Sequence, residues 1–524
     1  MRLKSIILVA ILATLLQAES PQWVFFDTKS AIDPIQTTPE LRARLERAGH
    51  VAGDPYDLPV NPAYVQTIAA LGAEVRHVSR WFNAVSIEAA DPAMLSAIRA
   101  LPFVTGIQPV AVRPALRDLR RTPPTPAVID YGASLDQLEM LEVPVAHAQG
   151  LDGRGIRIAV FDAGFRTLHP VFAEMDIAAT YDFVDHEENP EGVGDGHGIQ
   201  VLSVIGGYSA DELVGPAFGA TYLLARTEND VSESRGEEDN WVAAMEWADS
   251  LGVDIITSSL VYREFDDPAD NYGWQDMDGV TTLITQATTI AAQRGILVVN
   301  SMGNEGPGST SLWAPADGPH VMSVGSVNRD ETLSTFSGRG PTADGRIKPD
   351  VVALGSTVLA ASQNSGYSYV TGTSFAAPLI SGAAALVLQA NPSLTPDSLI
   401  ALFRFSGTRS ENPDNNLGWG IPRLSEILAS MPASPFPEAT VVPNPTSSRE
   451  ICILIPDRAA LSIESIRYYD ILGRDLGTQA VSALNPSDFH VFLPADKPLA
   501  AGVILFTLNG GAKTYRGKLL YLPK

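Results

Sequence analysis

The middle of the chain alternates between short apolar runs and longer helical stretches, and this pattern restricts the possible folds more than any other feature. Residues 156–161 have the length and composition of a buried strand, which ends at Asp162-Ala163-Gly164. The same reasoning predicts strands at 221–225, 255–261, 297–300 and 320–327, and helices at 198–205, 241–250 and 281–294. Such alternation predicts a parallel sheet with helices on both faces, and ligands bind at the carboxyl ends of the strands in such sheets.

Length and charge limit the function classes. The chain has 524 residues, of which 45% are hydrophobic, so two or more packed domains are expected. The 36 basic and 60 acidic residues give a net charge of −24, which argues against nucleic acid or an anionic membrane surface as a partner. The single cysteine, Cys452, excludes an intramolecular disulfide and a cysteine-rich zinc site.

The N-terminus has the layout of a secretory signal peptide over residues 1–18. Arg2 and Lys4 precede an apolar run at residues 6–16, and Ala18 offers a small residue for cleavage. No later segment runs 18 residues without charges or helix breakers, so we expect no membrane span in the mature protein. The protein is therefore expected to be secreted or held at the cell surface.

Residues 19–126 read as a separate small region. A helix is expected at 64–71 and another at 93–101, with strand-like alternation at 74–87 and 104–112. Together they predict an α+β unit over about 60–113, which could be an independent ferredoxin-like binding domain. The stretch at 113–126 is rich in Arg and Pro and suits an exposed linker open to cleavage.

Three polar residues attract attention along the central region. Ser374 follows a Gly-Thr turn and precedes a run of small helix-forming residues, so it should lie at a helix N-terminus, as a nucleophile or as a plain cap. Asp162 ends a buried strand, where a turn-forming Asp is also common. His197, in Asp195-Gly196-His197-Gly198, opens a helix and could equally be a surface cap.

These residue types together match the needs of amide hydrolysis by a serine. The reaction needs a base for the hydroxyl proton, an acid that holds this base in one tautomer, and donors for the oxyanion. Asp162, His197 and Ser374 could supply acid, base and nucleophile, and Asn304, on a Gly-rich loop after a strand, could donate to the oxyanion. A left-handed turn position is the structural alternative for Asn304.

Four motifs in this order resemble those of subtilisin-like serine proteases, the subtilase family. They are Asp162-Ala163-Gly164, His197-Gly198, Gly303-Asn304-Glu305-Gly306 and Gly372-Thr373-Ser374-Phe375-Ala376-Ala377-Pro378. The resemblance implies a three-layer α/β/α catalytic domain over 127–430. It also implies that Asp162 orients His197, that His197 is the general base and then the acid, that Ser374 attacks, and that Asn304 with the Ser374 backbone N–H forms the oxyanion hole.

A further segment resembles the family's strand that pairs with the substrate backbone. Ser258, Ser259, Leu260 and Val261 would bind a peptide as an added strand, with pockets that select its side chains. Val261 stands where the family usually has Gly, so the pocket for the residue before the cut is expected to be narrower or shifted. Ile199 stands where the family usually has Thr, and Ala163 stands where Ser or Thr is commoner. Neither change removes a catalytic group.

The unit before the catalytic domain is similar to the inhibitory propeptide of these proteases. The similarity rests on Gly72-Ala73-Glu74-Val75, on Phe82-Asn83-Ala84-Val85-Ser86 and on Leu101-Pro102-Phe103-Val104. Subtilases often bind structural calcium, but no ligands are assigned here and no cofactor is required. The acidic stretches at 226–228 and 237–240 could suggest such a site, and a solvated helix start is the preferred interpretation.

The end of the chain forms a last region of different character. A linker is expected at 431–440, and strand patterns at 451–455, 466–469, 489–493, 503–508 and 515–520 predict a small all-β sandwich over 441–524. Val442-Pro443-Asn444-Pro445, residues 469–474 and Lys518-Leu519 resemble the C-terminal sorting domain of the type IX secretion system of Bacteroidetes-like bacteria. An Ig-like accessory domain is the alternative.

The sequence thus predicts a secreted serine endopeptidase made as an autoprocessed zymogen. Its partners would be protein or peptide substrates, its own propeptide as an intramolecular inhibitor, and the type IX secretion machinery. Two alternatives remain open: a catalytically silent surface binding protein on a subtilase scaffold, and a protease dedicated to processing one partner.

Overall fold

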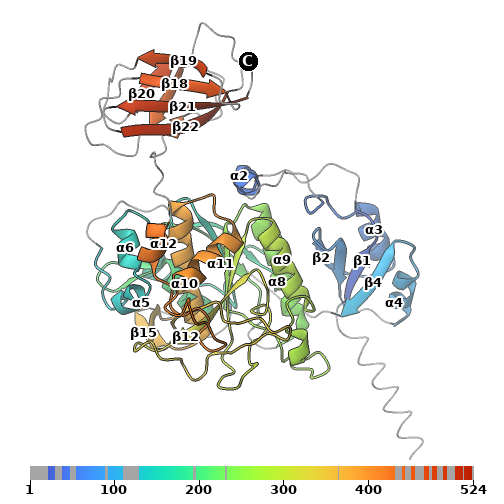
Figure 1. Cartoon of the computed structure of the whole chain (residues 1–524). Helices are drawn as coiled ribbons and strands as arrows, with labels where there is room; N and C mark the ends of the chain where they lie inside the picture. The colour runs from blue at the N-terminus through green and yellow to red at the C-terminus, as the bar shows by residue number, and fades with distance from the viewer. Residues whose placement is uncertain are drawn as a thin grey trace, which may run out of the picture. The chain divides into compact units, whose positions relative to one another are not determined.

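The computed structural model describes residues 22–29, 38–47, 55–88, 92–109, 129–192, 196–229, 233–363 and 365–430, and seven strands between 440 and 521 (Figure 1). The chain divides into two compact units, Met1–Leu428 and Ala429–Lys524, which are treated separately below. The predicted signal peptide, the predicted cleavable linker at 113–126 and most of the linker at 431–440 lie outside the described residues.

A seven-stranded sheet forms the centre of the first unit, in the order β13-β12-β11-β10-β5-β9-β6, and every neighbouring pair is parallel. This confirms the predicted parallel sheet. Its bounds are β5 Arg157–Asp162, β6 Asp176–Asp182, β9 Thr221–Arg226, β10 Ile255–Ser258, β11 Leu297–Ser301, β12 Val321–Val327 and β13 Val351–Leu354. The sequence did not reveal β6, which is half-exposed at the sheet edge, or β13, which has only 4 residues.

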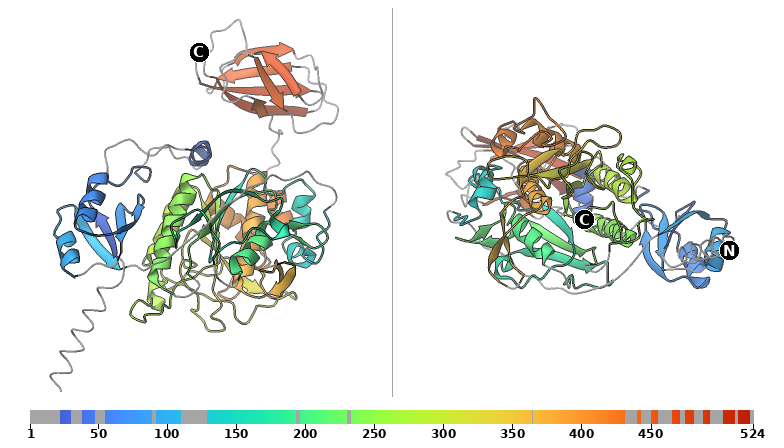
Figure 2. Two further views of the ribbon diagram at one scale, coloured as in Figure 1. Left: turned by 180° about the vertical axis from the view of Figure 1, so that it is seen from behind. Right: turned by 90° about the horizontal axis from the view of Figure 1, so that it is seen from below.

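Helices cover both faces of this sheet (Figure 2). Ala159 and Phe161 of β5 pack in one hydrophobic cluster with residues of α8 Arg235–Ser250 and α9 Leu283–Gln293, two helices that lie side by side. On the other face, α7 His197–Gly206 packs against α10 Thr373–Ala390, which contacts β10 to β13. Further α-helices in this region of the chain are α5 Leu135–Glu139, α6 Val143–His147, α11 Pro396–Phe405 and α12 Leu424–Ser430.

Helix α10 has the length and apolar composition of a membrane span, and no other helix among the described residues meets both conditions. However, 89% of its apolar window is buried within the protein. The helix therefore serves as a core helix of the first unit.

A small antiparallel sheet precedes the seven-stranded sheet in the chain, with its strands in the order β2-β3-β1-β4. It contains β1 Gln22–Phe26, β2 Val75–Ser79, β3 Ala84–Ile87 and β4 Val104–Pro109, with α3 Pro62–Ala70 and α4 Pro92–Arg99 packed on it. The expected unit at about 60–113 was too short, because β1 pairs with both β3 and β4. The run expected as one strand at 74–87 is a hairpin, whose turn includes Asn83 at φ 51°.

The second unit consists of two antiparallel sheets. One contains β16 Thr440–Val442, β17 Glu450–Leu454 and β20 Asp488–Phe492. The other contains β19 Asp475–Ala480, β18 Ser465–Asp470, β21 Gly502–Gly510 and β22 Lys513–Tyr521 in that order. The predicted strands are present, and β16 and β19 were missed. Residues 443–445 and 471–474 of the sorting-domain motifs lie outside the described residues.

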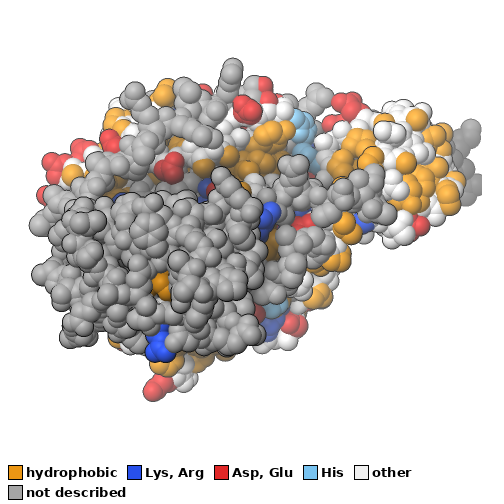
Figure 3. All heavy atoms as spheres, turned by 90° about the horizontal axis from the view of Figure 1, so that it is seen from above, with side chains coloured by type: hydrophobic (Ala, Val, Ile, Leu, Met, Phe, Trp, Pro, Cys, Tyr) orange, Lys and Arg blue, Asp and Glu red, His pale blue; other side chains and the backbone are white. Residues whose placement is uncertain are grey.

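The surface reflects the acidic composition. In the view from above, the Lys and Arg side chains that are visible form separate spots rather than one patch, with Asp and Glu side chains around them (Figure 3). Among the described residues that this view shows, positive charge is therefore not concentrated in one place.

Candidate active site

Asp162 and His197 form the core of the candidate site. Asp162 ends β5 and is completely buried, while His197 is the first residue of α7. The Nδ1 atom of His197 lies 2.8 Å from Oδ1 and 3.0 Å from Oδ2 of Asp162, and the Ala163 backbone N–H donates to the same carboxylate at 2.8 Å. A buried carboxylate in this position holds the imidazole in the tautomer that carries its proton on Nδ1.

Gly198 allows this close approach of α7 to β5. A Cβ atom at Gly198 would lie 2.2 Å from the carbonyl oxygen of Gly164 and 3.1 Å from the Cβ of Asp162. A side chain there would push the helix away from the strand. The Gly after His197 is therefore a steric requirement of the Asp–His contact.

Ser374 lies on the neighbouring helix, α10. It is the second residue of α10 and is 8% exposed, and the ring of the next residue, Phe375, lies 5.6 Å from the His197 ring. The helix begins at Thr373, and Gly372 occupies the cap position without a side-chain cap bond. Ser374 and Thr373 are therefore not helix caps, and the structural alternative for Ser374 was wrong.

The backbone carbonyl of Ser374 has an unusual partner. Pro378 lies four residues further along α10 and lacks the N–H that would normally bind this oxygen. The Ser259 hydroxyl donates to it instead, at 2.8 Å, and the Ser374 hydroxyl lies 3.5 Å from the Ser259 carbonyl oxygen. Sequence reasoning missed this side-chain role of Ser259. The proline four residues after Ser374 was the available signal, because it frees one helix carbonyl.

Asn304 lies on the loop after β11 and is exposed. Its Oδ1 atom accepts bonds from the Thr373 backbone N–H at 2.9 Å and the Thr373 hydroxyl at 3.1 Å. These bonds orient the side chain so that the Nδ2 end is the donor. The left-handed residue of this loop is Gly303, at φ +87°, and Asn304 is not among the residues with positive φ. The turn explanation for Asn304 was therefore wrong.

The expected substrate-pairing segment divides into two parts. Ser258 belongs to β10 between β5 and β11, is completely buried, and accepts a bond from the Trp241 indole at 3.0 Å. The hydroxyl of Ser258 is thus hydrogen-bonded, and its backbone pairs with a neighbouring strand on each side. Ser258 is therefore excluded from direct contact with a substrate. Ser259, Leu260 and Val261 continue beyond the end of β10, and the Asn300 amide donates to the Leu260 carbonyl at 2.9 Å.

Val261 lies beside the loop that carries Asn304. Its Cγ2 atom is 3.6 Å from the position that a Cβ atom would take at Gly303. The residue that replaces the family's usual Gly therefore contributes branched side-chain volume next to the candidate oxyanion site.

The acidic residues at the start of α8 are buried, contrary to the expectation of a solvated helix start. Glu228, Glu237, Glu238 and Asp239 are 8%, 2%, 3% and 1% exposed. Burial raises the pKa of Glu238 to about 7 and of Asp239 to about 6, the latter despite the opposing charge of Arg76. Their oxygens accept bonds from protein donors, namely the Tyr262 and Tyr272 hydroxyls, the Asn229 and Ser234 backbone N–H groups, and the Arg76 guanidinium.

The acidic residues of this segment are those that suggested a calcium site in the sequence. Among the residues that the structure describes, no group of three or more His, Cys, Asp or Glu side chains is arranged to hold a metal ion. The carboxylates instead fix the start of α8 and the chain that leads into it.

Comparisons with known proteins match two parts of the chain to family models. The model of the subtilase family matches residues 153–420, and that of the peptidase S8 propeptide domain of Bacteroidota matches residues 21–123. Subtilisin BL of Lederbergia lenta is 31% identical over 257 residues, which cover 49% of this chain and 84% of that protein. Serine protease AprX of Bacillus subtilis (strain 168) is 29% identical over 304 residues, which cover 52% of this chain and 66% of that protein.

A solved structure of a protease from Pseudoalteromonas arctica PAMC 21717 matches with a TM-score of 0.48 and 22% identity, over 58% of this chain and 99% of that one. The family model covers more than half of the sequence, and Subtilisin BL and Subtilisin E are among the proteins that match. The chain therefore belongs to the subtilase family and is a serine endopeptidase made as a zymogen, with its propeptide domain ahead of the catalytic domain.

Proposed function

We propose that Asp162, His197 and Ser374 are the catalytic triad of this endopeptidase. The observation that carries this assignment is the hydrogen bond between buried Asp162 and His197 Nδ1, with Ser374 on the adjoining helix. His197 takes the proton of the Ser374 hydroxyl as this oxygen attacks the scissile carbonyl, and then gives it to the leaving amine. Asp162 stabilises the imidazolium that forms in between, and water hydrolyses the acyl-enzyme by the reverse sequence.

The oxyanion of this reaction is bound by two donors. One is the Nδ2 group of Asn304, whose Oδ1 end is held by Thr373. The other is the Ser374 backbone N–H in the first turn of α10, where N–H groups have no partner within the helix. Both donors are held in place before the substrate arrives, which is the condition for strong stabilisation of the transition state.

The substrate is a protein or peptide whose backbone pairs with Ser259, Leu260 and Val261. These residues follow directly after the end of β10. An extended peptide can add to such a segment through main-chain hydrogen bonds. The volume of Val261 narrows the pocket for the residue before the cut.

Maturation follows from the propeptide. The propeptide domain is the intramolecular inhibitor of the enzyme. We propose that the Ser374 hydroxyl cuts the chain in the Arg- and Pro-rich stretch at 113–126, after the catalytic domain has folded. The enzyme needs no cofactor for this step or for later turnover.

Export is proposed to use both ends of the chain. Residues 1–18 have the features of a signal peptide, and the C-terminal unit resembles a type IX sorting domain in Val442, Tyr469-Asp470 and Lys518-Leu519. The C-terminal unit is compact on its own and is built of two antiparallel sheets. At the other end of the chain, the propeptide matches the model of the Bacteroidota propeptide domain. The protein is then secreted or held at the cell surface.

Self-processing tests the triad directly. In the full chain, Ser374→Ala should abolish peptide hydrolysis and leave the propeptide attached, and His197→Ala should do the same. Ser393→Ala, an exposed serine beyond the end of α10, is the matched control and should process normally. If N-terminal sequencing of the Ser374→Ala chain found the same processed N-terminus as in the wild type, self-cleavage would be contradicted. A wild-type chain that does not cut casein and does not react with a fluorophosphonate would instead be a silent binding protein. A scan against a peptide library separates a protease of broad specificity from one dedicated to a single partner.

A further inference from the structure

The propeptide has an arm that leaves its own sheet. Lys29 and Val60 lie opposite each other in an antiparallel bridge, so the chain departs after β1 and returns to the same place before α3. Between them lies helix α2 Pro39–Arg47. Leu41 and Leu45 on this helix are 0% and 1% exposed, although α2 belongs to neither hydrophobic cluster of the propeptide sheet.

Helix α2 packs closely on the catalytic domain. A Cβ atom at Gly252, in the turn after α8, would lie 2.3 Å from the Leu41 backbone nitrogen. Gly252 has φ +74° and is thus suited to Gly for its conformation as well as for this contact. The Thr38 hydroxyl lies 3.5 Å from the carbonyl oxygen of Ser250, the last residue of α8.

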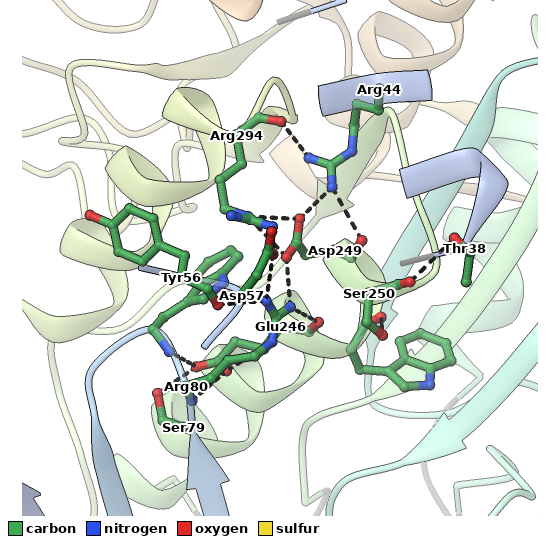
Figure 4. A network of polar contacts seen from close by, with 12 residues as sticks. Thr38, Arg44, Tyr56, Asp57, Ser79, Arg80, Glu246, Asp249, Ser250 and Arg294 are labelled. Atoms are coloured by element: carbon green, nitrogen blue, oxygen red, sulfur yellow. Dashed lines mark hydrogen bonds and ion pairs between the residues drawn. The ribbon is translucent and has the colours of Figure 1, made fainter. Parts of the chain in front are cut away.

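Arg44 of α2 binds the C-terminal ends of two helices at once. Its guanidinium bonds to the Asp249 carboxylate, to the Asp249 carbonyl oxygen at 3.2 Å and to the Arg294 carbonyl oxygen at 2.6 Å (Figure 4). Asp249 lies in the last turn of α8, and Arg294 follows α9. Helix C-termini carry carbonyls without partners and partial negative charge, so a cation is favoured there. Arg44 is 1% exposed.

A second arginine of the propeptide reaches the same carboxylate. Arg80, which follows β2, donates to the other Asp249 oxygen at 2.6 Å and to the Glu246 carbonyl at 2.9 Å. Asp57 of the arm accepts from Arg294 at 2.6 Å. The propeptide thus contributes two cations and one anion, and the catalytic domain contributes Glu246, Asp249 and Arg294, which are two anions and one cation.

This contact lies near the amino-terminal ends of the parallel strands, whereas the active site lies at their carboxyl-terminal ends. Asp254, just after α8, accepts from the backbone N–H of Arg157 at the start of β5, and Arg44 lines a small cavity with Asp254 and Leu297, the first residue of β11. Asp162 marks the other end of β5. The candidate active site and the contacts of α2 are therefore separated by the length of the strands.

We propose that the C-terminal ends of α8 and α9 form a second binding site for the propeptide, with Asp249 as its receptor for Arg44, and that residues 38–47 act as a clasp that slows departure of the cleaved propeptide. The inference rests on the proposed self-processing of the zymogen. The clasp can open without leaving a lone buried charge, because Arg294 bonds both Asp249 oxygens at 3.0 Å within the catalytic domain. Burial alone would raise the pKa of Asp249, but the guanidinium groups of Arg44, Arg80 and Arg294 hold it below its ordinary value.

Release of the propeptide from the full chain is the first test. Cleavage is followed by intact mass, and release by the delay before peptide hydrolysis begins and by the propeptide that co-elutes on size exclusion. Arg44→Ala should cleave at the wild-type rate and release the propeptide roughly tenfold faster or more. Arg42→Ala, an exposed arginine on the same helix, is the control and should behave as wild type.

A second variant guards against a folding defect of Arg44→Ala. Replacing residues 30–59 by a short Gly-Ser turn removes the whole arm, and the paired Lys29 and Val60 allow such a closure. This chain should also release the propeptide about tenfold faster. Release at the wild-type rate from the arm-replaced chain, or equal acceleration by Arg42→Ala, overturns the proposal.

Hydrogen–deuterium exchange on the uncut Ser374→Ala chain tests the contact without catalysis. Adding Asp249→Asn should speed exchange of the backbone amides of residues 38–47 by roughly tenfold or more, and adding Arg42→Ala should not. Unchanged exchange contradicts the clasp. If the wild-type chain does not cleave itself, the proposed function fails, while this measurement still decides the clasp.

Discussion

At the scale of single residues, Asn304 shows how one side chain can be held and still act. Thr373 binds its Oδ1 end through two donors, and this leaves the Nδ2 end as the donor beside the first turn of α10. The orientation depends on the contact between the loop after β11 and the start of α10. The oxyanion role therefore belongs to the Nδ2 end of the amide, and substitutions can test the roles of the Nδ2 and Oδ1 ends independently.

We expect Asn304→Ala to lower kcat by roughly 10² to 10³ with KM nearly unchanged, because the lost bond forms only in the transition state. Asn304→Asp is the informative partner, since it keeps an oxygen for Thr373 and removes the donor. Both variants should lose a similar factor in steady-state peptide hydrolysis. A full rate in either variant would show that Asn304 does not bind the oxyanion.

The sequence revealed the polar residues whose neighbours form short motifs, and it misjudged those whose surroundings are distant in the chain. Asp162 and His197 could be paired from their motifs, and the structure brings them within 2.8 Å. Ser258 is removed from the substrate by Trp241 on α8, which lies 17 positions earlier. Glu238 is buried partly by Tyr272, 34 positions later. Nothing local in the sequence shows such burial.

At the scale of elements, the entry to α8 depends on buried acids. Glu237 accepts from the Ser234 and Asn229 backbone N–H groups, and Glu228 accepts from the Tyr262 hydroxyl. Burial raises the pKa of Glu228 to about 8, and it also raises the pKa of Glu237. The folded protein therefore keeps protons on this segment that the unfolded chain releases at lower pH.

This difference predicts a pH-dependent stability. The Glu228 pKa is near 4.5 when unperturbed and about 8 in the folded protein, so the folded state binds the extra proton between these values. The free energy of unfolding must then fall as pH rises through this window. In the Ser374→Ala background, Glu228→Gln should match its parent in Tm at pH 4 and exceed it at pH 8 by about 2 °C or more.

Thermal unfolding across pH 4 to 9 measures this effect, with the exposed Glu411→Gln as the control. The control should follow the parent at every pH. Parallel curves for the Glu228→Gln variant and its parent would mean that this carboxyl carries no excess proton in the folded protein.

The elements that the sequence predicted are those with a continuous apolar run or a helical period. Strands β5, β9, β10, β11 and β12 are buried on both faces and were recognised from composition alone. The edge strand β6, with sequence DIAATYD, has a mixed pattern because four of its inner positions are partly exposed. Strand β1 was missed because it lies far in sequence from β3 and β4, and only pairing with them completes the propeptide sheet.

At the scale of the whole molecule, the chain separates catalysis from the C-terminal unit. Residues 1–428 form one compact unit, which contains the propeptide, the candidate triad and the clasp, and residues 429–524 form the other. The proposed division of labour assigns hydrolysis to the first and export to the second.

Truncation after Ser430 tests this division. The shortened chain should process itself and hydrolyse peptides at the wild-type rate when it is made in a host without type IX secretion. In a bacterium that has this system it should remain inside the cells, whereas the full chain appears at the surface or in the medium. Export of the shortened chain at the normal level would refute the sorting role, and loss of activity would show that the second unit supports the fold of the first.

The most direct test of the central claim is to label the processed enzyme with a fluorophosphonate and to locate the modified residue by peptide mass spectrometry. The account predicts one labelled serine, Ser374, with loss of casein hydrolysis in proportion to labelling. It also predicts no label on the Ser374→Ala or His197→Ala chain. A label on another serine, or casein hydrolysis that continues in the Ser374→Ala chain, would contradict the account.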